Sequence, residues 1–113
     1  ALSKEGIEVL NHYDNDHRSS GHLYITRIPN ISLEQRQAII EQMAECGIAT
    51  NVHYKPLPMM TAYKNLGFDI ANFPNAYARF ANEITLPLQT KLTSEEVEYI
   101  IDNYIRIAKQ FMQ

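Results

Sequence analysis

The sequence contains a single cysteine and no tryptophan, and it has no long apolar run. One cysteine, Cys46, excludes an internal disulfide framework. We expect it to be a small core residue of a helix in a reducing compartment, not a reactive thiol, because no basic neighbour is evident. Without a stretch of about 20 apolar residues, no segment is expected to span a membrane. The net charge of −3 gives no basic surface for nucleic acid or anionic lipid.

The 113 residues suit one domain, residues 1–113, with one modest core. No internal repeat, low-complexity tract or linker is present. Residues 1–10 include charged Lys4, Glu5 and Glu8, so no signal peptide is expected there. The first residue is alanine and not methionine, which fits a piece of a longer protein.

Four stretches rich in β-branched, apolar or aromatic residues predict short strands. They are residues 7–10, 23–28, 48–53 and 85–88. The last contains Leu-Pro-Leu and is expected at a sheet edge. The polar stretch 11–21 predicts a surface loop, and two prolines at 56 and 58 end regular structure after the third strand.

Two capping boxes, Ser32 with Gln35 and Thr93 with Glu96, predict the starts of two helices. Gly47 is expected to end the first helix in a left-handed conformation. The second carries an apolar stripe over residues 97–111. Between them, residues 59–66 predict a short helix, and residues 73–84 predict a helix that starts at Pro74 and buries one face.

This order of elements predicts an α+β fold, that is, a two-layer α/β arrangement. Helices would pack on one face of a small, mostly antiparallel sheet.

Residues 47–60 carry the clearest candidate site. His53 and Tyr54 end a predicted strand directly before a proline-stiffened turn, where folds commonly place binding groups. A histidine there could hydrogen-bond a sugar or phosphate oxygen, and its charge can change near neutral pH. From the spacing alone, the simpler interpretation of His53 is a structural residue that is hydrogen-bonded within the turn.

The loop also contains three histidines and two carboxylates, a donor set that zinc or nickel accepts. They are His12, Asp14, Asp16, His17 and His22. A spacing of five residues fits neither one strand face nor one helix face. A solvated polar loop is therefore the favoured interpretation.

Several short motifs occur together in a characteristic order. They are His22-Leu23-Tyr24, Gly47-Ile48, Val52-His53-Tyr54, Pro56-Leu57, Tyr63, Phe73-Pro74, Glu83, Leu86-Pro87-Leu88 and Leu92-Thr93. On these motifs, residues 20–105 resemble the C-terminal part of the DegT/DnrJ/EryC1/StrS aminotransferases. The chain departs from many members at Pro58, where they carry a second histidine.

The resemblance implies the C-terminal small domain of a fold type I aminotransferase, as a fragment of a larger chain. Such enzymes are cytoplasmic, bacterial homodimers that use pyridoxal 5′-phosphate and glutamate to aminate nucleotide-linked keto-sugars for lipopolysaccharide, glycan or antibiotic synthesis. The missing large domain would supply the Schiff-base lysine. We therefore expect no catalytic residue and no covalently bound cofactor in this fragment, which alone would be inactive. His53 and Tyr54 would contact substrate or shape the cleft.

A free-standing α+β binding or regulatory module without catalysis would show the same order of elements. A degenerate domain that regulates a partner is a third reading. A severed domain should expose an apolar patch where its large domain belonged, whereas an independent module should bury its apolar residues.

Overall fold

The computed structural model describes residues 1–112, and it contains a three-stranded antiparallel sheet and four α-helices. The strands are β1 (Glu8–Val9), β2 (Tyr24–Arg27) and β3 (Glu83–Leu86), in that spatial order. The helices are α1 (Leu33–Glu45), α2 (Thr61–Asn65), α3 (Pro74–Ala81) and α4 (Ser94–Ala108). Single 3₁₀ turns are η1 (Leu2–Glu5), η2 (Leu57–Met59) and η3 (Ile70–Asn72). The predicted α+β class is confirmed.

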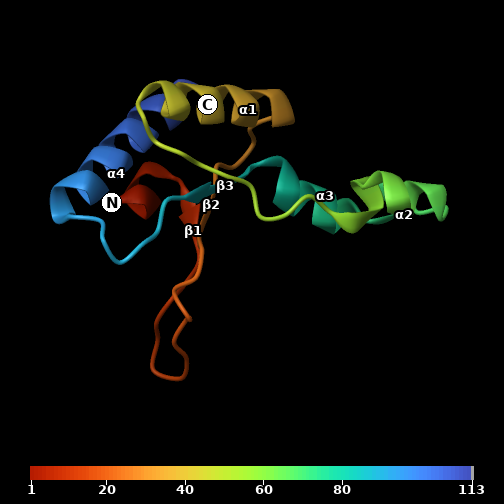
Figure 1. Cartoon of the computed structure of the whole chain (residues 1–113), viewed down its shortest axis with the longest axis horizontal. Coiled ribbons are helices and arrows are strands. Elements are labelled where there is room, and N and C mark those ends of the chain that lie inside the picture. Colours follow the sequence, from red (N-terminus) through yellow and green to blue (C-terminus); the bar gives the residue numbers. More distant parts are fainter. Residues whose placement is uncertain (113) are drawn as a thin grey trace.

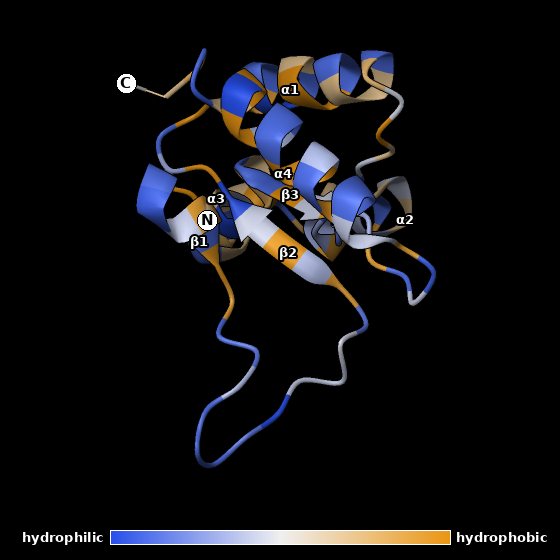
Figure 2. Ribbon diagram, turned by 90° about the vertical axis from the view of Figure 1, so that its left-hand side faces the viewer, coloured by the Kyte–Doolittle hydropathy of each residue, from blue (hydrophilic) through white to orange (hydrophobic). Residues whose placement is uncertain are grey.

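Figure 1 shows α1 and α4 packed together over one face of the sheet, while α2 and α3 extend sideways from it. We call residues 57–81, which include η2, α2, η3 and α3, the arm. The stretch between β1 and β2 forms a long polar loop, as predicted for residues 11–21. It projects away from α1 and α4 (Figure 2).

Both long helices begin where the sequence predicts, and α1 also ends as predicted, whereas α4 ends at Ala108, before Phe111 of the predicted stripe. The hydroxyl of Ser32 accepts the N–H of Gln35 at 3.2 Å, and the Gln35 side chain accepts the N–H of Ser32 at 2.8 Å. Thr93 and Glu96 make the same pair of bonds at 3.2 and 2.8 Å. Gly47, with φ of +74°, ends the first helix in the left-handed region. Local side-chain chemistry therefore sets these boundaries.

Strand β3 alternates its side chains between the core and the opposite face. Ile84 and Leu86 lie in the core, and Ile84 is paired directly with Thr26 of β2. Residues paired in this way project from the same face of a sheet. The remaining buried apolar side chains come from both long helices and the connecting segments: Leu2, Ile7, Ile28, Ile31, Ile39, Met43, Ile48, Ile100, Tyr104, Ile107 and Ala108.

The predicted strand at residues 48–53 is wrong. Only Asn51 pairs, in one isolated bridge with Thr85. The next two N–H groups are taken by side chains, since Val52 donates to Asn51 Oδ1 at 2.8 Å and His53 donates to Glu83 Oε2 at 2.9 Å. Side-chain acceptors thus replace the ladder that a strand would need.

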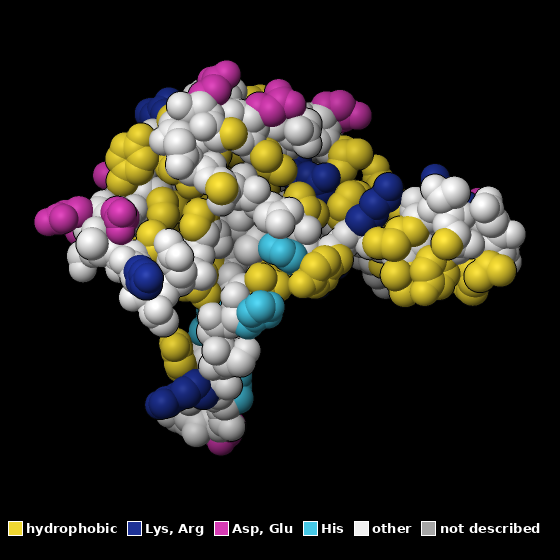
Figure 3. Space-filling model, in the orientation of Figure 1, with side chains coloured by type: hydrophobic (Ala, Val, Ile, Leu, Met, Phe, Trp, Pro, Cys, Tyr) yellow, Lys and Arg dark blue, Asp and Glu magenta, His cyan; other side chains and the backbone are white. Residues whose placement is uncertain are grey.

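The helix predicted over residues 73–84 is shorter than expected and buries no face. It ends at Ala81, and Ile84 belongs to β3. No residue of α3 is buried, and Phe73 and Tyr77 are each 40% exposed. The physical reason is that the arm has no second layer within the described chain. Figure 3 shows the resulting apolar surface along the arm.

Cys46 packs against the core as expected, but it is only partly buried, at the C-cap of α1. The expected absence of a basic neighbour is wrong, because Arg106 Nη2 donates to its sulfur at 3.5 Å. The Cys46 carbonyl accepts the hydroxyl of Tyr99 at 3.0 Å. Across residues 1–112, no helix reaches the length and apolarity needed to cross a membrane.

A buried hydrogen-bond chain joins α4 to the sheet. Thr26 Oγ1 lies 2.7 Å from the Ile84 carbonyl and 2.7 Å from the Tyr104 hydroxyl. The Thr26 hydroxyl has one hydrogen, which goes to the carbonyl because a carbonyl can only accept. Tyr104 therefore donates to Thr26. Burial raises the pKa of Tyr104, so this phenol stays protonated well above neutral pH.

We expect Tyr104→Phe to lower the free energy of unfolding by about 1 kcal/mol, because one buried hydrogen bond is lost while Thr26 keeps its acceptor. Tyr99→Phe is the matched control on the same helix. Its side chain is 52% exposed, so the expected loss is below about 0.5 kcal/mol. Urea unfolding of both variants measures the difference. Equal losses would contradict the assignment.

Candidate functional site

The segment that follows α1 runs across the outer edge of β3 and then enters the arm (Figure 1). Asn51 and Thr85 exchange two backbone hydrogen bonds, of 3.1 and 2.8 Å, which fix the segment against the strand. This attachment brings His53 and Tyr54 to the face of the sheet opposite the core side chains of β3.

His53 is held by two side chains of β3. Its backbone N–H donates to Glu83 Oε2 at 2.9 Å, and its Nδ1 lies 2.9 Å from Thr85 Oγ1. Thr85 Oγ1 in turn donates to Glu83 Oε1 at 2.5 Å. Glu83 and Thr85 are two residues apart on a strand, so they project from the same face. The three residues form a closed, hydrogen-bonded triangle, which we call the Glu83–Thr85–His53 cluster.

Tyr54 lies beside this cluster but points into solvent. Its ring meets the edge of the His53 ring at 4.7 Å between centroids, and the side chain is 69% exposed. The peptide bond between the two residues is cis. His53 lines a shallow pocket of about 190 Å³ together with His22, Asn51 and Thr85, whereas Tyr54 does not line it. A substrate contact by either residue stays a prediction.

Arg36 of α1 lies behind the cluster and connects it to the arm. Its Nη1 donates to the Phe80 carbonyl at 2.5 Å, and its guanidinium lies 4.5 Å from the centre of the Phe80 ring. Burial lowers the pKa of Arg36, and the negative charge of Glu83 opposes that shift. The buried Glu83 carboxylate therefore has a positive charge close by.

The residues that position His53 are not among those predicted from the sequence. Glu83 enters there only as one piece of a motif, and no role is predicted for Thr85 or Arg36. A usable signal was present, because Glu83 and Thr85 alternate with Ile84 and Leu86 in a strand. Two polar residues on one face of a fully buried strand require polar partners.

The loop histidines do not come together. His17 pairs with Asp14, the ring of His12 stacks on Tyr24 at 5.3 Å, and His22 lines the shallow pocket. No group of three or more metal-ligating side chains occurs in the part of the chain that the structure describes.

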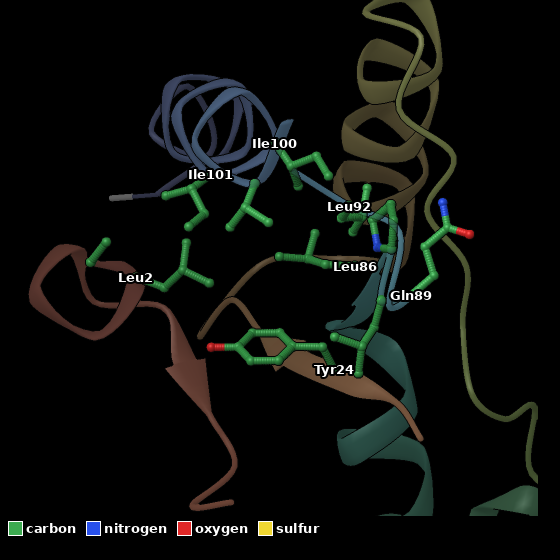
Figure 4. Close-up of a pocket in the computed structure, with 11 residues that line it drawn as sticks. Leu2, Tyr24, Leu86, Gln89, Leu92, Ile100 and Ile101 are labelled. Carbon is green, nitrogen blue, oxygen red and sulfur yellow. The ribbon is translucent and has the colours of Figure 1, made fainter. Parts of the chain in front are cut away.

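A second pocket, of about 280 Å³, lies between η1, the sheet and the start of α4 (Figure 4). Apolar side chains dominate its walls, among them Leu2, Leu86, Leu92, Ile100 and Ile101. Tyr24 and Gln89 are the polar side chains in its lining, which includes no carboxylate, histidine, lysine, arginine or cysteine side chain, and the pocket therefore has the character of a packing surface.

The three-stranded sheet and the two long helices that cover it form an α+β domain, with the Glu83–Thr85–His53 cluster at the edge strand β3. Residues 2–104 match the DegT/DnrJ/EryC1/StrS aminotransferase family, and the chain belongs to this family.

Curated relatives and solved structures are similar to most of this chain. It is 30% identical over 94 residues to the UDP-4-amino-4,6-dideoxy-N-acetyl-beta-L-altrosamine transaminase of Helicobacter pylori, covering 83% of this chain and 25% of that protein. A protein of Methanocaldococcus jannaschii, MJ1066, is 30% identical over 92 residues, covering 79% and 24%. The structure superimposes on the PLP-form of Spr1654 from Streptococcus pneumoniae, assigned as a sugar aminotransferase. The TM-score is 0.90 at 56% identity, covering 95% and 27%. The chain thus spans about a quarter of the length of these relatives.

The lysines of this chain do not fit a covalent site for pyridoxal phosphate. Such a site needs a lysine held against the cofactor in a shielded environment. All five lysines, Lys4, Lys55, Lys64, Lys91 and Lys109, are exposed, and none lines either of the two pockets described above. Lys109 instead pairs with Glu5 at 2.5 Å.

We expect Arg36→Met to lower the free energy of unfolding by about 1–2 kcal/mol. The variant removes a charged hydrogen bond to Phe80 and the positive charge near Glu83, although it also removes the unpaired Nε. Arg79→Met, at an exposed position of α3, is the control and should change stability by less than about 0.5 kcal/mol. Thermal unfolding compares the two. Similar losses in both variants would mean that Arg36 does not support the cluster.

Proposed function

We propose that this chain is the C-terminal small domain of a sugar aminotransferase that transfers an amino group from glutamate to a nucleotide-linked keto-sugar. The whole enzyme would use pyridoxal 5′-phosphate, act as a homodimer and work in the cytoplasm. In it, this domain forms one wall of the substrate cleft. The remainder of the enzyme supplies the lysine, and the fragment alone does not transaminate.

The observation that carries the proposal is the agreement of nearly the whole chain with one quarter of Spr1654, at a TM-score of 0.90 and 56% identity. At that identity the likeness extends beyond a shared fold. The match to the Helicobacter pylori transaminase supports a nucleotide sugar as the substrate class.

The exposed apolar surfaces support a domain that packs against further protein. Six large apolar side chains of the arm are 38–73% exposed: Leu57, Met60, Leu66, Phe68, Phe73 and Tyr77. The apolar pocket of Figure 4 adds a second uncovered surface at the other end of the sheet. A free-standing module would bury such residues, so these surfaces weigh against that alternative.

Within the enzyme, the cofactor supplies the electron sink for amino transfer when it is bound. This chain's own contribution is to hold the sugar. His53 offers a polar ring in the shallow pocket, and Tyr54 offers an exposed aromatic surface beside it. Both would contact substrate or shape the cleft, and neither would transfer a proton.

The isolated chain should not bind pyridoxal phosphate at a defined lysine, because its lysines are all exposed. We expect a protein-bound absorbance band, distinct from that of the free cofactor, only in the longer protein that carries this sequence at its C-terminal end. Borohydride reduction followed by peptide mapping locates the modified lysine. A single modified lysine within residues 1–113 of the isolated chain would contradict the proposal.

In the longer enzyme, His53→Gln should raise the KM for the nucleotide-linked keto-sugar about 10-fold, which corresponds to about 1.4 kcal/mol for one hydrogen bond. The half-reaction with glutamate involves no sugar and should keep its rate. Single-turnover absorbance measures the rate of each half-reaction, the first with glutamate and the second with a panel of nucleotide-linked keto-sugars at varied concentration, which gives the KM. His17→Gln, in the exposed loop, is the control and should leave both rates unchanged. If His53→Gln slows the glutamate half-reaction equally, His53 has no specific role toward the sugar.

A further inference from the structure

We infer that Glu83 and Thr85 fix the tautomer of His53, with the hydrogen on Nδ1, so that Nε2 accepts a hydrogen bond from a sugar hydroxyl. The tautomer rests on this chain alone. The choice of a sugar hydroxyl as the ligand rests on the proposed function. Glu83 and Thr85 are positioning residues, because they act on the substrate only through His53.

Glu83 is the buried end of the cluster. Both of its oxygens face donors, since Oε2 accepts the N–H of His53 at 2.9 Å and Oε1 accepts the hydroxyl of Thr85 at 2.5 Å. Glu83 is only 4% exposed, and the guanidinium of Arg36 provides a positive charge nearby. Two donors and a neighbouring cation are the surroundings that stabilise an ionised carboxylate, which has no hydrogen to give.

The position of the Thr85 hydroxyl hydrogen then determines which ring nitrogen of His53 carries a hydrogen. The Thr85 hydroxyl has a single hydrogen, and the carboxylate of Glu83 takes it. Thr85 Oγ1 can therefore only accept at its second contact, which is His53 Nδ1 at 2.9 Å. Nδ1 must then carry a hydrogen, and in the neutral ring Nε2 is left with a lone pair.

The Nε2 nitrogen belongs to a side chain that lines the shallow pocket. His53 lines the pocket of about 190 Å³, and no side chain of residues 1–112 forms a hydrogen bond with its Nε2. A neutral ring in this tautomer binds a donor and does not bind an unprotonated phosphate oxygen. Of the two ligands that a histidine here could hold, the cluster selects a sugar hydroxyl over a phosphate.

Nitrogen-15 NMR of the 113-residue chain, labelled at histidine and recorded at about pH 8, above the ordinary range of histidine titration, tests the tautomer directly. We expect a pyridine-like shift at Nε2 of His53 and a pyrrole-like shift at Nδ1. The opposite pattern in the unmodified chain would overturn the inference.

Three variants of the cluster and one control variant test the cause. Thr85→Ser keeps a hydroxyl and should keep the shifts, whereas Thr85→Val should lose the preference for Nδ1–H. Glu83→Gln should reverse it, because the amide would accept from the His53 N–H and donate to Thr85, whose hydrogen would then point to Nδ1. Thr26→Val removes a buried hydroxyl from the neighbouring strand and should leave His53 unchanged. Unaltered His53 shifts in folded Thr85→Val would overturn the inference, even if Glu83→Gln fails to fold.

The longer enzyme tests the ligand. Thr85→Val should raise the KM for the keto-sugar about 5- to 10-fold without slowing the glutamate half-reaction, and Thr85→Ser should restore it. An unchanged KM beside a lost tautomer preference would overturn the recognition of a hydroxyl. Failure of the unmodified enzyme to aminate any keto-sugar would overturn the proposed function, while the NMR result would still decide the tautomer.

Discussion

The pairing of β2 with β3 is the constraint on which both the core and the candidate site depend. Four consecutive residue pairs set its register, from Tyr24 with Leu86 to Arg27 with Glu83. In this register Ile84 faces the core, while Glu83 and Thr85 hold His53 on the other side. A slip of one residue would exchange the two sets. The site therefore takes its geometry from the same backbone ladder that supports the core.

The two faces of the sheet follow the same rule of hydrogen-bond direction. On the core face, the Ile84 carbonyl takes the hydrogen of Thr26, so Tyr104 must donate. On the site face, the Glu83 carboxylate takes the hydrogen of Thr85, so His53 must donate. In each case a buried threonine donates its one hydrogen to a group that can only accept. The aromatic side chain must therefore donate to the threonine oxygen. A hydroxyl with one hydrogen can transmit that constraint because burial excludes competing water.

The sequence predicted those features that depend on residues close together in the chain. Both capping boxes and the left-handed Gly47 were confirmed, because each involves at most four consecutive residues. His53 and Tyr54 were found from a strand-end position and a resemblance to a family. The strand at 48–53 failed because Glu83, 30 residues away from His53, takes an N–H that a ladder would use. Thr85 is likewise 32 residues from His53, the side chain that it contacts. No local pattern contains contacts of that separation.

A second failed prediction, a buried face on α3, is informative about packing. Phe73 and Tyr77 recur at the spacing of a helix that packs against a neighbour, yet both are 40% exposed. The periodicity correctly indicates a face suited to burial, but it does not say which surface covers that face. Within residues 1–112 nothing does, and relatives about four times longer have further chain available. Apolar periodicity therefore encodes an interface as readily as a core, and an exposed amphipathic helix favours a domain over a complete protein.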